Sequence, residues 1–230
     1  MPVLRYIAQW FSNYENRGSI GSRLRARRTE PLLRMIDAAF REKGSVDILD
    51  VGGTRTYWNI VDPSVLSTRK VTITILNLPG SGTPADDDTF KYLEADGCDL
   101  SVFGNRQFDI AHSNSVIEHV GDWGRMVQFA NEILRVSNRC FVQTPNYWFP
   151  VEPHCMTPLF HWLPRPTRVW LVRHVQLGHW PKAGTIEQAV KTVDSASLLS
   201  RPMFHSLFPN ATIFTERVFC LPKSFIALRD

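Results

Sequence analysis

The chain has 230 residues, of which 43% are hydrophobic and 21% charged, and its formal net charge at pH 7 is +4. This composition excludes a disordered chain, and the length suits one sizeable α/β domain. No apolar run approaches the roughly 20 residues needed to span a bilayer, and the first residues contain no apolar core of signal-peptide length, so we expect a cytoplasmic protein.

The first predicted element is a helix that begins near Thr29. A hydroxyl at this position caps free N–H groups, and Pro31 fits the first turn of a helix. Four apolar residues between 32 and 40 then fall on one helical face, and the element ends at Lys43–Gly44. A strand over 46–51 follows and ends at a double glycine.

The next elements alternate between strands and helical segments. The residues at 71–76 are apolar and rich in β-branched types, and three more strands are predicted over 90–96, 108–114 and 138–146. Asp122 caps a helix that lies between the last two of these strands. Because parallel neighbours need helical crossovers, this alternation indicates a parallel sheet.

After Pro145 the pattern changes, because prolines and aromatic residues crowd together until two final strands over 211–219 and 223–230. We therefore predict a single domain, 1–230, made of consecutive segments. These are an N-terminal helical segment (1–45), a core (46–145), a cap or acceptor-binding insertion (146–205) and a closing hairpin (206–230). Long inserted segments in compact domains are usually functional.

The residues that follow the first strand predict a ligand-binding turn. Glycines at positions 52 and 53 bring backbone N–H groups close to a ligand without an intervening side chain, and Asp50 can lie under the turn and hold it. The sequence lacks the third glycine of a GxGxxG fingerprint and has Arg55 instead, which disfavours a nicotinamide dinucleotide.

In order and spacing, four motifs resemble those of the class I S-adenosylmethionine (SAM)-dependent methyltransferases: "DVGGT", the strand end at Asn77, "ADGC" and "HSNSVIEHV". The closest likeness is to the small-molecule branch that includes the ubiquinone-pathway O-methyltransferases, and it covers residues 46–145. The resemblance implies an α/β fold with a doubly wound, mostly parallel, seven-stranded Rossmann-like sheet and a helical insertion before the last antiparallel hairpin.

The resemblance also implies a set of cofactor-binding residues. In the family, the first turn holds the methionine part of SAM, an acidic residue ending the second strand binds the ribose, and an aspartate after the third strand binds the adenine amino group. Asn77 stands at the ribose position, and Arg55 either points outward or reaches the cofactor carboxylate. The implied residues are Asp50, Gly52, Gly53, Thr54, Asn77, Leu78, Asp96, Gly97, Cys98, Ser113 and Asn114.

The candidate catalytic residues are Glu118, His119 and His154. The first two lie just past the fourth strand, beside the expected methyl group, and His154 has Glu152 nearby to orient it. In the ubiquinone branch, this glutamate and histidine bind a divalent metal together with a second glutamate three residues earlier. Because Ser115 occupies that earlier position, we predict no metal site. The cysteines, Cys98, Cys140, Cys155 and Cys220, lack zinc-site spacing and are expected to be reduced.

The expected function is methyl transfer to an oxygen or nitrogen of a small-molecule or lipid- or sugar-linked acceptor. The aromatic residues of the insertion suit the core of a cap, an apolar acceptor pocket or a peripheral contact with a membrane surface. Arginines near the start, Arg17, Arg23, Arg25, Arg27 and Arg28, suit a solvated face or an anionic partner. Two alternatives stay open: a nucleic-acid methyltransferase, although no base-flipping motif is present, and a partner protein of this fold without catalysis.

Overall fold

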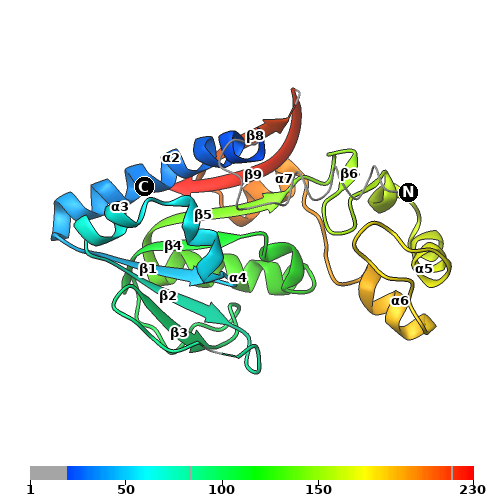
Figure 1. The fold of residues 1–230 in the computed structure, drawn as a ribbon, viewed down its shortest axis with the longest axis horizontal. Helices are drawn as coiled ribbons and strands as arrows, with labels where there is room; N and C mark the ends of the chain where they lie inside the picture. Colours follow the sequence, from blue (N-terminus) through cyan, green and yellow to red (C-terminus); the bar gives the residue numbers. More distant parts are fainter. Residues whose placement is uncertain (1–19, 83, 219) are drawn as a thin grey trace.

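The computed structural model describes residues 20–82, 84–218 and 220–230, and its centre is one seven-stranded sheet in the order β3-β2-β1-β4-β5-β9-β8 (Figure 1). The strands are β1 (Val46–Val51), β2 (Val71–Asn77), β3 (Phe90–Glu94), β4 (Phe108–Asn114), β5 (Ser137–Pro145), β8 (Thr212–Val218) and β9 (Leu221–Arg229).

The first five strands of this sheet run parallel, and the hairpin β8–β9 closes it in the antiparallel direction. In the register, Asp50 lies between Ile75 of β2 and His112 of β4, so the carboxyl ends of three strands meet beside it. These pairings confirm the predicted doubly wound, mostly parallel sheet with a terminal antiparallel hairpin.

Helices cover both faces of the sheet. On one face lie α2 (Ile20–Lys43), the 3₁₀ helix η1 (Arg55–Ile60) and α3 (Pro63–Thr68), which bury Ile36 and Trp58 against Ile73. On the other face, α4 (Trp123–Val136) and α7 (Arg201–Leu207) bury Phe129 and Phe204. Asp122 is the N-cap of α4, as predicted, since its side chain accepts the Arg125 N–H. In the described residues, no helix combines the length and apolarity that a membrane span requires.

The predicted start of the first helix is wrong. Helix α2 begins at Ile20, so Thr29 lies inside the helix, where it is buried, and Pro31 is an interior residue. An interior proline costs one backbone hydrogen bond, and burial of four apolar side chains on this face offsets it: Leu32, Met35, Ile36 and Ala39. Arg17, and the side chains of Arg23, Arg25 and Arg27, lie outside the described residues.

Residues 147–198 form a separate unit, which we call the cap, beyond the carboxyl ends of β4 and β5 (Figure 1). It contains β6 (Val151–Glu152), β7 (Thr157–Pro158), the 3₁₀ helix η3 (Phe160–Trp162), α5 (Arg165–His174) and α6 (Ile186–Val193). Phe160 and Val172 belong to a small core of its own. A parallel bridge between Asn146 and Leu199 joins the two chain segments where the cap meets the sheet.

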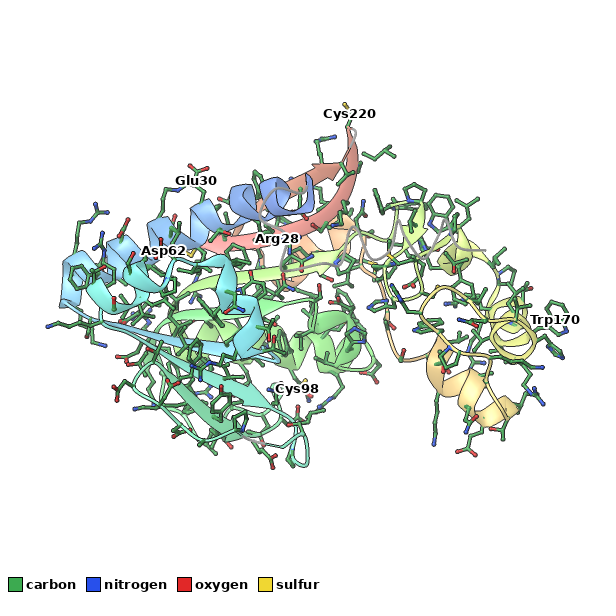
Figure 2. The ribbon with its side chains drawn as sticks, in the orientation of Figure 1. Arg28, Glu30, Asp62, Cys98, Trp170 and Cys220 are labelled. Carbon is green, nitrogen blue, oxygen red and sulfur yellow. The ribbon has the colours of Figure 1, made fainter. Side chains whose placement is uncertain are left out.

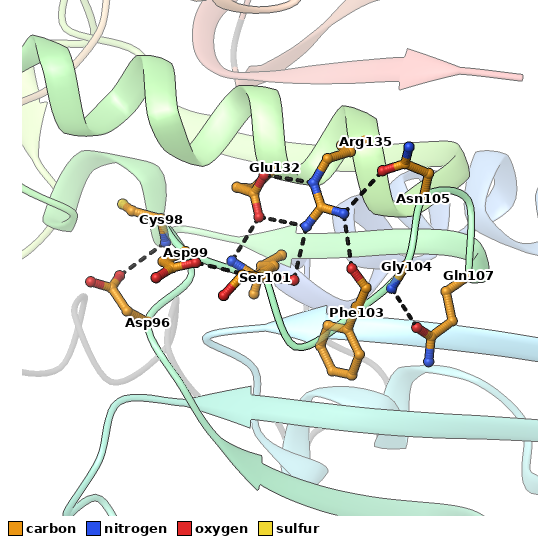
Figure 3. Close-up of polar contacts among 11 residues, drawn as sticks. Asp96, Cys98, Asp99, Ser101, Phe103, Gly104, Asn105, Gln107, Glu132 and Arg135 are labelled. Carbon is orange, nitrogen blue, oxygen red and sulfur yellow. Dashed lines mark hydrogen bonds and ion pairs between the residues drawn. The ribbon is translucent and has the colours of Figure 1, made fainter.

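Arg135 of α4 fixes the loop between β3 and β4 (Figure 3). Its guanidinium group donates to the backbone oxygens of Leu100, at 2.8 Å, and Phe103, at 2.9 Å, and pairs with Glu132. Glu132 in turn accepts the backbone N–H of Leu100. This loop contains Asp96, Gly97 and Cys98, so the network holds a predicted cofactor-binding segment against α4.

Candidate functional site

The chain bends sharply at Gly52 and Gly53, directly after β1. Gly52 has a φ of +74°, and a Cβ atom there would lie 2.5 Å from the side chain of Val116. A Cβ atom on Gly53 would lie 1.8 Å from Oδ2 of Asp50. Because real Cβ atoms do not approach other atoms so closely, the packing requires glycine at both positions. The bend therefore presents bare backbone at the carboxyl end of β1.

Asp50 lies beneath this bend, fully buried, and both of its carboxyl oxygens have partners. Oδ2 accepts a hydrogen bond of 2.8 Å from Nε1 of Trp58, and Oδ1 lies 2.7 Å from Nδ1 of His112. Trp58 reaches this position because η1 begins immediately after the bend, with Thr54 as its N-cap accepting the Tyr57 N–H. The element that follows the glycines is thus a short 3₁₀ helix, and Asp50 anchors the bend.

Other predicted cofactor-binding residues surround the bend. The amide of Asn77, at the end of β2, donates to the backbone oxygen of Gly53 at 3.1 Å, and Ser113 of β4 donates to the oxygen of Val51 at 3.0 Å. Asn114 accepts a hydrogen bond of 3.0 Å from Arg28. Leu78 is 62% exposed, so an apolar side chain stands open to solvent next to the bend.

The segment after β3 also reaches the bend. Gly97 packs so closely on Val51 that a Cβ atom would lie 2.7 Å from that side chain. Asp96 accepts the backbone N–H of Cys98 at 2.9 Å and pairs with Arg125 at 2.5 Å. Burial raises the pKa of Asp96, but these two partners outweigh it, and the pKa lies below its ordinary value. Asp96 is therefore held as an anion at the edge of the site.

Arg55 turns away from the bend. Its guanidinium group pairs with Asp87 at 2.6 Å and lies 4.7 Å from the ring centre of Phe90, near the amino end of β3. Of the two orientations that the sequence left open, the structure has the outward one.

The three candidate catalytic residues converge at the junction of the sheet and the cap. Glu118 and His119 lie on the 3₁₀ helix η2 (Ile117–His119), which follows β4, and His154 comes from the cap. One side-chain nitrogen or oxygen from each residue lies within 4.8 Å of the others. The backbone N–H of His119 donates to the oxygen of Val116, whose side chain lies over Gly52, so one short turn links this group to the bend.

Glu118 is 1% exposed, and its two oxygens have different environments. Oε2 accepts a hydrogen bond of 3.0 Å from Thr144, whereas Oε1 has no hydrogen-bond partner among the residues that the structure describes. Burial raises the pKa of Glu118 to about 7. A buried carboxyl oxygen without a partner is costly, so a ligand that satisfies it would be stabilised here.

The two histidines face each other. Nδ1 of His119 lies 2.7 Å from the backbone oxygen of Ser195, and Nδ1 of His154 lies 2.6 Å from Oε1 of Glu152. Their Nε2 atoms are 3.0 Å apart. Desolvation lowers the pKa of His119; burial lowers that of His154 too, but the hydrogen bond and charge of Glu152 outweigh it and raise the pKa.

A cavity of about 620 Å³ lies between the cap and the start of α4. Its lining includes Glu152, which contacts His154, three aromatic side chains, Tyr147, His161 and Trp162, and the basic side chain of Arg168. The aromatic residues of the insertion thus have several environments. Phe160 is buried, whereas Trp148 and Trp170 are exposed, the latter at the outer end of the cap (Figure 2).

Sequence reasoning missed the residues that position the predicted ones. No sequence motif indicated that Trp58 and His112 contact Asp50. Trp58 is 8 residues from Asp50 in the chain, and His112 is 62 residues from it. Ser195 is 76 residues from His119 and contributes only its backbone, which any residue type would supply. Periodicity and motif spacing report local structure, and they contain no information about such pairs.

Comparisons with known proteins give a likeness of structure alone. No protein-family model matches the chain, and no curated protein matches its sequence. A SAM-dependent methyltransferase from Archaeoglobus fulgidus aligns with a TM-score of 0.50 and 10% identity, over 86% of this chain and 94% of that one. A protein assigned to the Zn-dependent alcohol dehydrogenases of Rhodobacter sphaeroides gives 0.51 and 10%, over 89% and 97%.

An O-methyltransferase family protein from Burkholderia thailandensis gives a TM-score of 0.46 at 12% identity, over 98% of this chain and 69% of that one. The first two structures are named for different enzyme classes, so these likenesses concern the fold. The strand order, the closing hairpin and the Archaeoglobus structure together show that this chain has the Rossmann-like fold of the class I SAM-dependent methyltransferases.

Proposed function

We propose that the protein is a SAM-dependent methyltransferase acting on an oxygen or nitrogen of a small-molecule or lipid- or sugar-linked acceptor. The observation that carries the proposal is the bend at Gly52 and Gly53, where no side chain fits and bare backbone lies beside the carboxyl ends of three strands. Ligands of open α/β sheets bind at such strand ends.

In this proposal the cofactor lies along the residues that surround the bend. Its methionine part follows the backbone of Gly52 and Gly53, its ribose contacts Asn77, its adenine amino group donates to Asp96, and its adenine ring covers Leu78. An amide lacks the charge of a carboxylate, so the ribose contact is weaker by about 1 kcal/mol than a charge-assisted one.

The acceptor occupies the cavity beneath the cap, and the methyl group moves in line. The acceptor atom forms a bond to the methyl carbon while the carbon–sulfur bond breaks and its electron pair returns to sulfur. A hydroxyl acceptor must also lose its proton. Glu118, His119 and His154 are the residues that would accept this proton, because they lie one turn from the bend and His154 contacts Glu152 of the cavity lining.

Calorimetric titration with SAM tests the cofactor site, using Leu78→Ser with Val102→Ser as its matched control. Both side chains are well exposed, at 62% and 66%, so neither change disturbs the core. Loss of an apolar contact with adenine costs about 1–2 kcal/mol, so Leu78→Ser should bind SAM about 5- to 30-fold more weakly. Val102→Ser, in the loop before β4, should bind like the wild type.

Two results would contradict the proposal. Equal losses in both variants would show that Leu78 does not contact the cofactor, and absence of SAM binding at millimolar concentration would favour a partner protein that has no catalytic role. With binding established, release of S-adenosylhomocysteine in the presence of fractionated metabolites identifies the acceptor. His119→Ala should then lower turnover and leave SAM affinity intact, because the ring contacts Ser195 and His154 and not the bend.

A further inference from the structure

The hydrogen bonds of His119 and His154 fix which ring nitrogen carries a proton. A backbone carbonyl oxygen only accepts, so Nδ1 of His119 must be the donor toward Ser195. The carboxyl group of Glu152 accepts two backbone N–H groups through Oε2, and its Oε1 faces Nδ1 of His154, which is therefore protonated as well. In each neutral ring, Nε2 is then the unprotonated nitrogen.

Two unprotonated nitrogens consequently face each other at 3.0 Å. Two lone pairs at this distance repel, so a positive centre is needed between or beside them. Two kinds of centre fit: a proton, with one ring as imidazolium, or a metal ion bound by both nitrogens. The histidine pair alone does not distinguish them.

Glu118 decides between the two. Its Oε1 atom is buried, lacks a partner among the described residues, and belongs to the same cluster of ligand atoms within 4.8 Å of one another. A proton shared by the histidines leaves this oxygen unsatisfied, whereas an ion bound to both rings reaches it. A metal ion therefore satisfies all three atoms with one ligand.

We propose that Glu118, His119 and His154 bind a divalent first-row transition-metal ion such as Zn²⁺. Two histidines and one carboxylate form a common three-ligand set for such ions and leave coordination positions open, whereas Mg²⁺ and Ca²⁺ prefer oxygen ligands. Two nitrogens bound at about 2.1 Å lie about 3.0–3.4 Å apart, close to the observed separation. His119 is exposed, so the ion can enter from solvent.

The surrounding residues suit a metal site. Ligating histidines usually donate their other ring N–H to a carboxylate or a carbonyl oxygen, as His154 and His119 do here. Ser115, which led to the expectation of a metal-free site, donates to Gln143 and is not part of the cluster. The third ligand comes instead from the cap, far from the other two in sequence.

The role of the ion rests on the proposed function, although its binding does not. An ion held by Glu118, His119 and His154 would lower the pKa of an acceptor hydroxyl bound to it, so that the hydroxyl could lose its proton to solvent before methyl transfer. The site would thus recognise acceptors whose methylated group is a hydroxyl able to bind a metal ion.

Calorimetry with ZnCl₂ on protein treated with a chelator tests the binding, and Co²⁺ absorption reports the coordination. We expect one ion per chain, with His154→Ala and Glu118→Gln each weakening binding by about 100-fold. Glu118→Gln is nearly isosteric, so it preserves the fold if His154→Ala does not. His205→Ala, which changes an exposed histidine of α7, should leave the affinity unchanged.

Absence of binding at about 0.1 mM Zn²⁺ or Co²⁺ would overturn the proposal and leave a proton as the positive centre. Undiminished binding in both His154→Ala and Glu118→Gln would overturn the proposal too, because the bound metal would then be an adventitious ion only. SAM titrations of the same proteins keep the two hypotheses apart, because metal binding without SAM binding refutes the proposed function and not this site.

Discussion

Substitution of Gly53 by alanine tests the anchoring of the bend by Asp50. The added methyl group would lie 1.8 Å from Oδ2 and 2.1 Å from Cγ of the Asp50 side chain. The carboxyl group is fully buried and cannot swing into solvent. We therefore expect the Asp50 carboxyl group to lose its hydrogen bonds with Trp58 and His112, or the bend to shift away from it.

The expected loss follows from these contacts. Each buried polar group left without a partner costs about 1–3 kcal/mol, and the disrupted pair leaves both the carboxyl group and the indole N–H unsatisfied. The free energy of unfolding should fall by about 3–5 kcal/mol. For a chain of this size, that corresponds to a decrease in Tm of about 6–20 °C.

Urea and thermal unfolding, followed by circular dichroism, measure this loss, and the indole ¹H–¹⁵N signal of Trp58 reports the hydrogen bond directly. Gly104→Ala is the matched control, since the nearest atom to its Cβ would be Oε1 of Gln107 at 3.8 Å and its φ is not positive (Figure 3). The control should change stability by less than about 1 kcal/mol. Equal stability of the two variants, with an unshifted Trp58 signal, would refute this account of the bend.

Three other substitutions have defined outcomes. Arg55→Ala should leave SAM affinity within about twofold, because Arg55 pairs with Asp87 outside the bend; a calorimetric loss of tenfold would contradict this orientation. Burial raises the pKa of Glu216, but the charge of Arg28 outweighs burial, and the pKa lies below its ordinary 4.5. The Glu216 carboxylate therefore stabilises the fold fully above pH 4.5, and its contribution is lost as the pH falls through the lowered pKa. Glu216→Gln should therefore cost about 2–4 kcal/mol at pH 7 in urea unfolding, and a cost that does not shrink below pH 4.5 would rule out the charged pair. Cys220, at the tip of the β8–β9 hairpin (Figure 2), should react rapidly with a thiol reagent, whereas burial raises the pKa of the other three cysteines to about 11–12; persistence of the rapid phase in Cys220→Ser would disprove the assignment.

The sequence predicted those features that depend on neighbouring residues. The strands over 46–51 and 71–76 agree with β1 and β2 to within one residue, because β-branched apolar runs bounded by turns are a local signal. The helix cap at Asp122 is local for the same reason. The parallel direction of the first five strands followed from the alternation of elements, and the closing antiparallel hairpin followed from the family resemblance.

Features that depend on packing could not be predicted in this way. Thr29 and Pro31 form a good local helix start, but α2 begins at Ile20, so both are interior residues of a helix whose following apolar face packs on the sheet. Likewise, the sequence placed His154 among the candidates without its position, because its contact with His119 requires the cap to lie against η2. The orphaned oxygen of Glu118 exists only in the folded chain.

The two hydrogen-bond contacts of Asp50 constrain which substitutions proteins related to this chain can accept. Replacing any one of Asp50, Trp58 and His112 leaves buried polar atoms of the others without a partner, so we expect the three residues to change together in related proteins. A search for remote homologues should accordingly weight these positions as a unit.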